Sequence, residues 1–196
     1  MKIKKHHKTF FLIPGFGMQA KDNSYFWLVK YLEGKGMKVI KTPVKWNRKV
    51  LSQNAKEFVE FYNKNKSDEN YVLGFSYGSV ITLLTANILK PKKVFLCSLS
   101  PDFSEDQKLM TPTIVKYIGK RRFADTKTRS GKKFAKELLI PSVIFYGEAE
   151  GKKYPSLKKR CEETAKLAKN SKLVVVKAAP HQIDFPSYIE VIKKTL

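Results

Sequence analysis

A serine between two glycines interrupts an apolar stretch in the first half of the chain. The sequence YVLGFSYGSV, residues 71–80, places Ser76 between Gly74 and Gly78. A serine hydroxyl in a tight turn can act as a nucleophile, because the turn exposes it and flanking glycines remove side chains that would collide. The alternative is a tight turn whose serine has no chemical role.

The segments on either side of Ser76 define the structural setting of this turn. Residues 70–75 are apolar and predict a strand, and residues 77–90 have helical spacing up to Pro91. A helix that begins at Tyr77 points its N-terminus at the serine, where it favours a developing negative charge. We therefore expect Ser76 at the end of a strand, placed to attack a carbonyl carbon.

A serine nucleophile needs a base, and His181 is the histidine whose position fits that role. It follows the apolar run of VVVKAAPHQID and is therefore expected on a loop after the last strand. A histidine there can accept the serine proton when both loops meet at one edge of a sheet. The alternative is a turn histidine that caps the final helix.

An orienting carboxylate is expected after the strand before that one. The sequence VIFYGEAEGKKYP carries two candidates, Glu148 and Glu150, and either would also suit an ordinary surface position. The resulting chain order is serine, acid, histidine. This set of residue types predicts nucleophilic acyl chemistry, which requires no metal and no organic cofactor.

Six apolar runs separated by helical patterns predict the scaffold for these residues. Runs that are apolar throughout are typical of parallel strands covered on both faces. We therefore expect a three-layer α/β/α sandwich with about six mostly parallel strands, whose carboxyl ends carry the functional residues. The expected strands are residues 9–13, 37–44, 70–75, 92–99, 141–148 and 172–179.

Residues 102–137 differ from the rest of the chain because they are polar, basic and less regular. We expect them to form a short lid of two helices, with residues 111–123 as one helix, inserted in a single domain of residues 1–196. A basic lid would attract a substrate that bears a carboxylate, a phosphate or CoA; the alternative is a solvated helical face. The basic residues of this segment are Lys108, Lys116, Lys120, Arg121, Arg122, Lys127, Arg129, Lys132, Lys133 and Lys136.

Three motifs resemble those of the α/β-hydrolase superfamily, in particular its small members with little or no cap. GFSYG at 74–78 is similar to the nucleophile elbow, PGFG at 14–17 to the oxyanion loop, and PHQID at 180–184 to the histidine loop. The resemblance covers the chain from FFLIPGFG to APHQID, and it begins at the third strand of the family. Pro14 stands where the family usually has histidine.

The resemblance also implies roles for residues around the serine. The backbone amides of Phe16 and Tyr77 would hold the oxyanion. Aligned on the preceding glycine, the acid of the family falls on Glu150 rather than on Glu148. Asp102 is a third candidate, because some relatives carry the acid after the corresponding strand.

The expected activity is that of a serine hydrolase on carboxylic esters, or thioesters, of small to medium acyl groups. The alternatives are a catalytically silent hydrolase fold that binds anions or nucleic acid, and a peripheral lipase drawn to anionic lipid. Apolar lid residues would line an acyl site or pack the lid onto the body; they are Leu109, Met110, Ile114, Val115, Tyr117 and Ile118.

The composition narrows the class of partner. The 196 residues carry a net charge of +22, which attracts anions, but no recognition module for nucleic acid is visible. The expected partner is therefore a small acyl substrate, anionic if the lid recruits it, and no pattern specifies an oligomeric state. No apolar run approaches the ~20 residues of a membrane span, and no signal peptide or disulfide pattern is visible, which together favour the cytoplasm.

Overall fold

A sheet of six parallel strands forms the centre of the computed structural model, which describes residues 7–196. The strand order within this part of the chain is β2-β1-β3-β4-β5-β6, and all neighbouring strands are parallel. The strands are β1 (Lys8–Ile13), β2 (Lys38–Lys41), β3 (Glu69–Phe75), β4 (Lys93–Cys97), β5 (Ser142–Gly147) and β6 (Ser171–Val176). Each of the six expected apolar runs therefore contains a strand.

The strand β2 is shorter than the expected residues 37–44. It ends at Lys41, and the last backbone hydrogen bond along this edge joins the Thr42 amide to the Leu12 carbonyl oxygen at 2.9 Å. Pro43 comes next, and it has no amide hydrogen with which to continue the ladder. The proline therefore releases the chain from the edge of the sheet.

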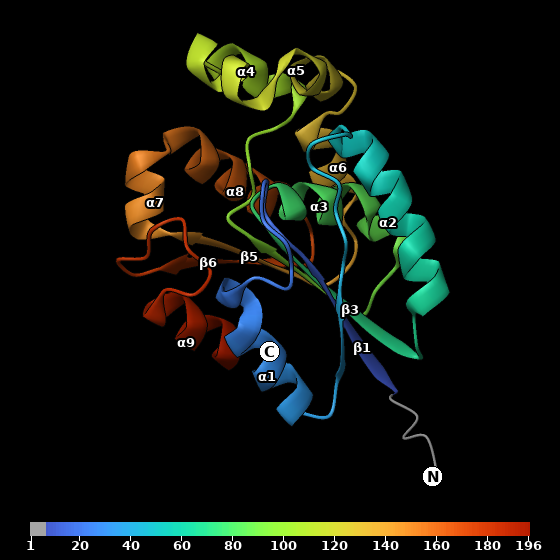
Figure 1. The fold of residues 1–196 in the computed structure, drawn as a ribbon. Coiled ribbons are helices and arrows are strands. Elements are labelled where there is room, and N and C mark those ends of the chain that lie inside the picture. Colours follow the sequence, from blue (N-terminus) through green and yellow to red (C-terminus); the bar gives the residue numbers. More distant parts are fainter. Residues whose placement is uncertain (1–6) are drawn as a thin grey trace.

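Helices cover both faces of the sheet because its strands are apolar on both sides. In β1, Phe10 and Leu12 face one side and Phe11 and Ile13 the other, and all four are fully buried. Figure 1 shows the first face covered by α1 (Phe26–Gly34) and α9 (Pro186–Thr195), and the second by α2 (Leu51–Asn65), α3 (Tyr77–Leu89) and α8 (Pro155–Leu167). The predicted three-layer α/β/α sandwich is confirmed. None of the helices in the described residues is long and apolar enough to cross a membrane.

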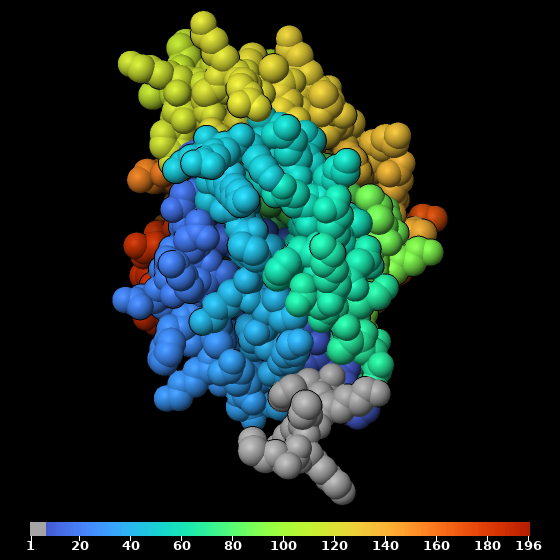
Figure 2. All heavy atoms as spheres, turned by 45° about the vertical axis from the view of Figure 1, so that its right-hand side comes forward, coloured from blue at the N-terminus to red at the C-terminus, as the bar shows by residue number. Residues whose placement is uncertain are grey.

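The segment between β4 and β5 contains four short helical elements where two helices were expected. They are the 3-10 helix η2 (Ser104–Leu109), α4 (Pro112–Ile118), α5 (Lys120–Thr126) and α6 (Gly131–Glu137). The prediction of one helix over 111–123 is wrong, because Gly119 has a φ of 86° and a ψ of 150° and separates α4 from α5. Figure 1 shows these two helices beyond the sheet, and Figure 2 shows that they form one end of the molecule.

Buried ion pairs stabilise this segment internally, and hydrogen bonds attach it to α2. The Arg129 guanidinium donates from Nη2 to Oδ2 of Asp102 at 2.6 Å, and it also pairs with Asp125. Asp125 accepts hydrogen bonds from the amide and hydroxyl of Ser52, in the first turn of α2. Burial raises the pKa of Asp102 to about 6, although Arg129 opposes the rise. The arginine is therefore the main stabiliser of a carboxylate that is only 1% exposed.

Replacing Gly78 by alanine should destabilise the protein severely. A Cβ at Gly78 would lie 2.2 Å from the carbonyl oxygen of Ile13, so that β1 and α3 would have to separate. We expect the free energy of unfolding to fall by about 3 kcal/mol or more, measured by chemical denaturation. The matched control is Gly34→Ala at the end of α1, where nothing lies within 4 Å of an added Cβ. Equal stability of the two variants would contradict the close approach of α3 to β1.

Replacing Arg129 by methionine should leave Asp102 buried without its cation. Removing one partner of a buried pair costs about 3–5 kcal/mol, which a thermal melt would show as a large fall in Tm. Lys127→Met is the control, because Lys127 is exposed and has no ion pair in the described residues. A melting temperature of Arg129→Met equal to that of the control would show that the pair does not stabilise the protein.

Candidate active site

The backbone at Ser76 is held in an unusual conformation between β3 and α3. Ser76 has a φ of 55° and a ψ of −118°, a backbone conformation that residues other than glycine rarely adopt. A Cβ at Gly74 would lie 2.2 Å from the carbonyl oxygen of Gly78, and both glycines are therefore required for the turn. This is the geometry of a nucleophile elbow, with the serine at the carboxyl end of a central strand.

His181 lies beside Ser76 although the two residues are far apart in the sequence. Its Nε2 is 3.2 Å from the Ser76 Oγ, within reach of a proton transfer from the hydroxyl. The imidazole packs against the Phe75 ring, with 4.8 Å between centroids and 36° between the ring planes, and this contact restrains its orientation. The histidine lies on the loop between β6 and α9, as the sequence predicts.

Glu150 is the carboxylate that the structure brings to His181. It lies in α7 (Glu148–Lys153), a short helix that begins where β5 ends, and its Oε1 makes a short hydrogen bond with the Nδ1 of His181. Its Oε2 accepts from the Gly147 amide at 2.8 Å and from the Ser98 hydroxyl at 3.0 Å. The residue is 1% exposed, so these donors replace the water that an anion loses on burial.

The other two candidate acids lie elsewhere. The carboxylate of Glu148 accepts from the Ala178 amide at 3.1 Å and from Lys152 at 3.2 Å. The hydrogen bond from Ala178 holds the pKa of Glu148 below its usual value. Asp102 is paired with Arg129 as described above. Of the three carboxylates, only Glu150 has a hydrogen bond with His181 among the described residues.

The two amides expected to hold an oxyanion lie on either side of the serine. A Cβ at Gly15 would be 3.3 Å from the Ser76 Cβ, which places the loop that carries Phe16 directly against Ser76. Tyr77 is the first residue of the 13-residue helix α3. No acceptor in the described residues takes the amide hydrogen of Phe16 or Tyr77. Both amides are therefore available to a negative oxygen beside Ser76.

Three residues that the sequence analysis did not assign also contact the site. The Ser100 Oγ lies 3.2 Å from the Ser76 Oγ, and the Ser98 Oγ lies 3.0 Å from the hydroxyl of Tyr188 as well as from Glu150. Both serines follow β4 at the carboxyl edge of the sheet, which is a signal that could have found them. Nothing in the sequence indicated a role for Tyr188, because it lies on the buried, apolar face of α9 like an ordinary core residue.

A cavity of about 650 Å³ opens above Ser76 and His181. The lid forms part of its wall, and five of the six apolar lid residues named from the sequence line it, all except Val115. Within the described residues, no group of His, Cys, Asp and Glu side chains is arranged to hold a metal ion. The apolar and aromatic lining residues are Phe16, Met18, Phe75, Tyr77, Pro101, Leu109, Met110, Ile114, Tyr117, Ile118, Tyr154, Leu157 and Ile183.

Solved structures of α/β-hydrolases have the same fold as this chain. Est1E from Butyrivibrio proteoclasticus aligns with a TM-score of 0.81 at 15% identity, over 97% of this chain and 86% of that chain. A lipase-esterase related protein from Clostridium acetobutylicum aligns with a TM-score of 0.71 at 18% identity, over 99% and 96%. Mouse alpha/beta hydrolase domain-containing protein 10 aligns with a TM-score of 0.71 at 12% identity, over 95% and 87%.

The chain therefore has the α/β-hydrolase fold, as its three motifs predict. No family model and no curated protein matches the sequence. The likeness to the solved structures is consequently one of fold, and the chemistry has to be argued from the site itself.

The two glutamates of α7 should differ sharply in their effect on the reactivity of Ser76. Glu150→Gln removes the carboxylate beside His181, and we expect the rate of covalent labelling by a fluorophosphonate probe to fall by ~100-fold or more. Glu148→Gln, two residues away, should label at a rate within about threefold of the parent. Comparable losses in the two variants would contradict the assignment of Glu150.

Proposed function

We propose that the protein is a serine hydrolase that cleaves carboxylic esters of small to medium acyl groups. The observation that carries the proposal is the continuous hydrogen-bonded chain from Ser76 through His181 to the buried Glu150. It lies at the carboxyl edge of the sheet, where open α/β sheets place their sites. We also propose that residues 1–196 act as one domain in the cytoplasm, with 102–137 as the lid.

The geometry suits formation of an acyl-enzyme. His181 takes the proton from Ser76 as the serine oxygen attacks the carbonyl carbon, and Glu150 stabilises the imidazolium that forms. The amides of Phe16 and Tyr77 hold the oxyanion. The imidazolium then gives its proton to the leaving alcohol, and water attacks the acyl-enzyme in the reverse sense to release the acid. A thioester would follow the same path with a thiol as leaving group.

The cavity supports a small or medium acyl group as substrate. Its volume of about 650 Å³ is in the range of about 300–1,000 Å³ that small-molecule sites occupy. Aromatic rings of Phe16, Tyr117 and Tyr154 line it, which suits an aryl or alkyl chain. The similar structure Est1E is described with ferulic acid bound, an aromatic carboxylic acid.

The alternative is a catalytically silent fold that binds anions or nucleic acid through its net charge. It predicts no activated serine, so covalent labelling separates the two functions. The hydrogen bond between His181 and Ser76 favours the enzyme.

The purified protein should hydrolyse 4-nitrophenyl esters of short and medium acids, and labelling by a fluorophosphonate should stop the reaction. Ser76→Ala and His181→Ala should each reduce kcat by at least ~1,000-fold, because each removes a member of one reacting unit. Ser187→Ala is the matched control, since its hydroxyl donates to the Lys177 carbonyl oxygen, outside the cavity. A folded parent that is neither labelled nor active would refute the proposal.

A further inference from the structure

We propose that the cavity admits uncharged acyl chains and excludes anionic ones, despite the strongly positive charge of the protein. This inference rests on the proposed function and specifies its substrate class. It also implies that the basic residues behind the net charge of +22 lie on the outer surface and do not bind the substrate.

The lining of the cavity differs in charge from the rest of the protein. Lysine and arginine make up 39 of the 196 residues, yet neither type contributes to the lining among the described residues. Among residues 7–196, the only basic side chain in the lining is His181, whose nitrogens are committed to Ser76 and Glu150. The charged groups that do line the cavity are carboxylates, namely Asp102, Asp106 and Asp184.

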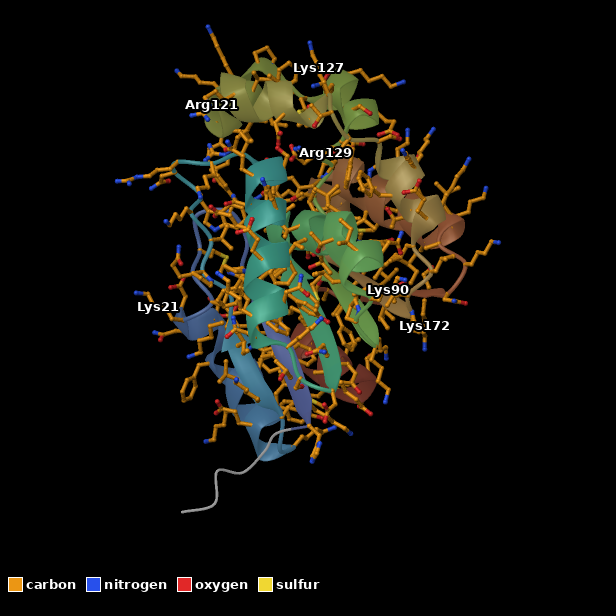
Figure 3. All side chains as sticks on the ribbon, turned by 90° about the vertical axis from the view of Figure 1, so that its right-hand side faces the viewer. Lys21, Lys90, Arg121, Lys127, Arg129 and Lys172 are labelled. Carbon is orange, nitrogen blue, oxygen red and sulfur yellow. The ribbon has the colours of Figure 1, made fainter. Side chains whose placement is uncertain are left out.

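The basic residues of the lid lie on its outer surface. Figure 3 shows Arg121 and Lys127 on the outside of the lid, whereas Arg129 lies beneath it, toward the body. Lys116 and Lys120 are also exposed, and neither lines the cavity. Salt screens such charges over a Debye length of about 8–10 Å, so they attract anions to the surface without stabilising one inside.

Two arginines pair with carboxylates that line the cavity. Arg129 pairs with Asp102 and Asp125. Arg160 of α8 holds Asp106 through two hydrogen bonds, at 2.6 and 3.1 Å. These two ion pairs neutralise the cavity carboxylates that they contact, and neither guanidinium lines the cavity.

Arg122 is held by a hydrogen bond and a cation–π contact. It donates to the Ile118 carbonyl oxygen at 3.0 Å and lies over the Phe16 ring, 4.7 Å from its centroid. Phe16 lines the cavity, whereas Arg122 itself does not.

An anionic chain that enters this cavity would lose water and gain no cation. A buried charge without a partner is strongly unfavourable, and the exposed carboxylate of Asp184 at the cavity edge adds repulsion. An uncharged chain instead contacts apolar side chains such as Leu109 and Ile114, which lose their exposure to water. The charge of the acyl chain therefore determines whether it binds in the cavity.

Two esters test the inference: the mono-4-nitrophenyl ester of octanedioic acid and the 4-nitrophenyl ester of its half-amide. They have the same chain length and the same leaving group. One carries a terminal carboxylate and the other a terminal carboxamide. At pH 7.5 and physiological salt, we expect kcat/KM to be ~100-fold or more higher for the carboxamide. The unsubstituted octanoate ester serves as the reference for an apolar chain.

A variant that supplies the missing cation should reverse part of this discrimination. Leu109 lines the cavity and is 43% exposed, so Leu109→Arg adds a guanidinium without burying it completely. We expect it to raise kcat/KM for the carboxylate ester by ~10-fold or more. Ile88→Arg is the matched control, because Ile88 is 66% exposed and lies outside the cavity. If Leu109→Arg does not fold, Ile114→Arg, at 41% exposure, replaces it.

The possible results distinguish this inference from the proposed function. Equal or faster hydrolysis of the carboxylate ester by the parent would overturn the inference and leave the esterase proposal standing. Equal gains in Leu109→Arg and Ile88→Arg would also overturn it, because surface charge would then control the selectivity. Absence of both turnover and fluorophosphonate labelling would overturn the two proposals together.

Discussion

The burial of the Glu150 carboxylate is the constraint on which the candidate site depends. An anion that is 1% exposed is stable only where donors surround it, and here these are the Gly147 amide, the Ser98 hydroxyl and His181. The donors come from the ends of β5, β4 and β6. The carboxylate therefore links three strand ends, and the position of the imidazole depends on the register of the sheet.

Backbone strain is concentrated at the same edge. Three of the four non-glycine residues with positive φ in the described residues, Ser76, Ser98 and Ala178, follow β3, β4 and β6; the fourth, Lys90, caps a helix. Such conformations cost of order 1–3 kcal/mol each and persist only where packing enforces them. The parallel sheet and its two helical layers supply that packing, so the stability of the core maintains the geometry of the site.

The basic residues have two different roles, one on the outer surface and one in buried ion pairs, and the net charge alone does not distinguish them. Exposed lysines and arginines give the outer surface its positive field, while buried arginines neutralise carboxylates of the lid itself. The lid is attached to α8 by the ion pair of Asp106 with Arg160, and its apolar residues line the cavity. One short basic segment therefore provides attachment, cavity wall and surface charge through different side chains.

The sequence by itself determined the layers of the fold and the candidates for the site. Strand and helix periodicities are local, so the six strands, the elbow at Ser76 and the loop of His181 follow from residues close in sequence. It did not decide between Glu148 and Glu150, or show that Ser98 and Tyr188 support the acid. Nor did it separate the outward-facing lysines of the lid from the inward-facing Arg129. These distinctions depend on which distant residues meet in space, and only the packing of the sheet and helices brings them together.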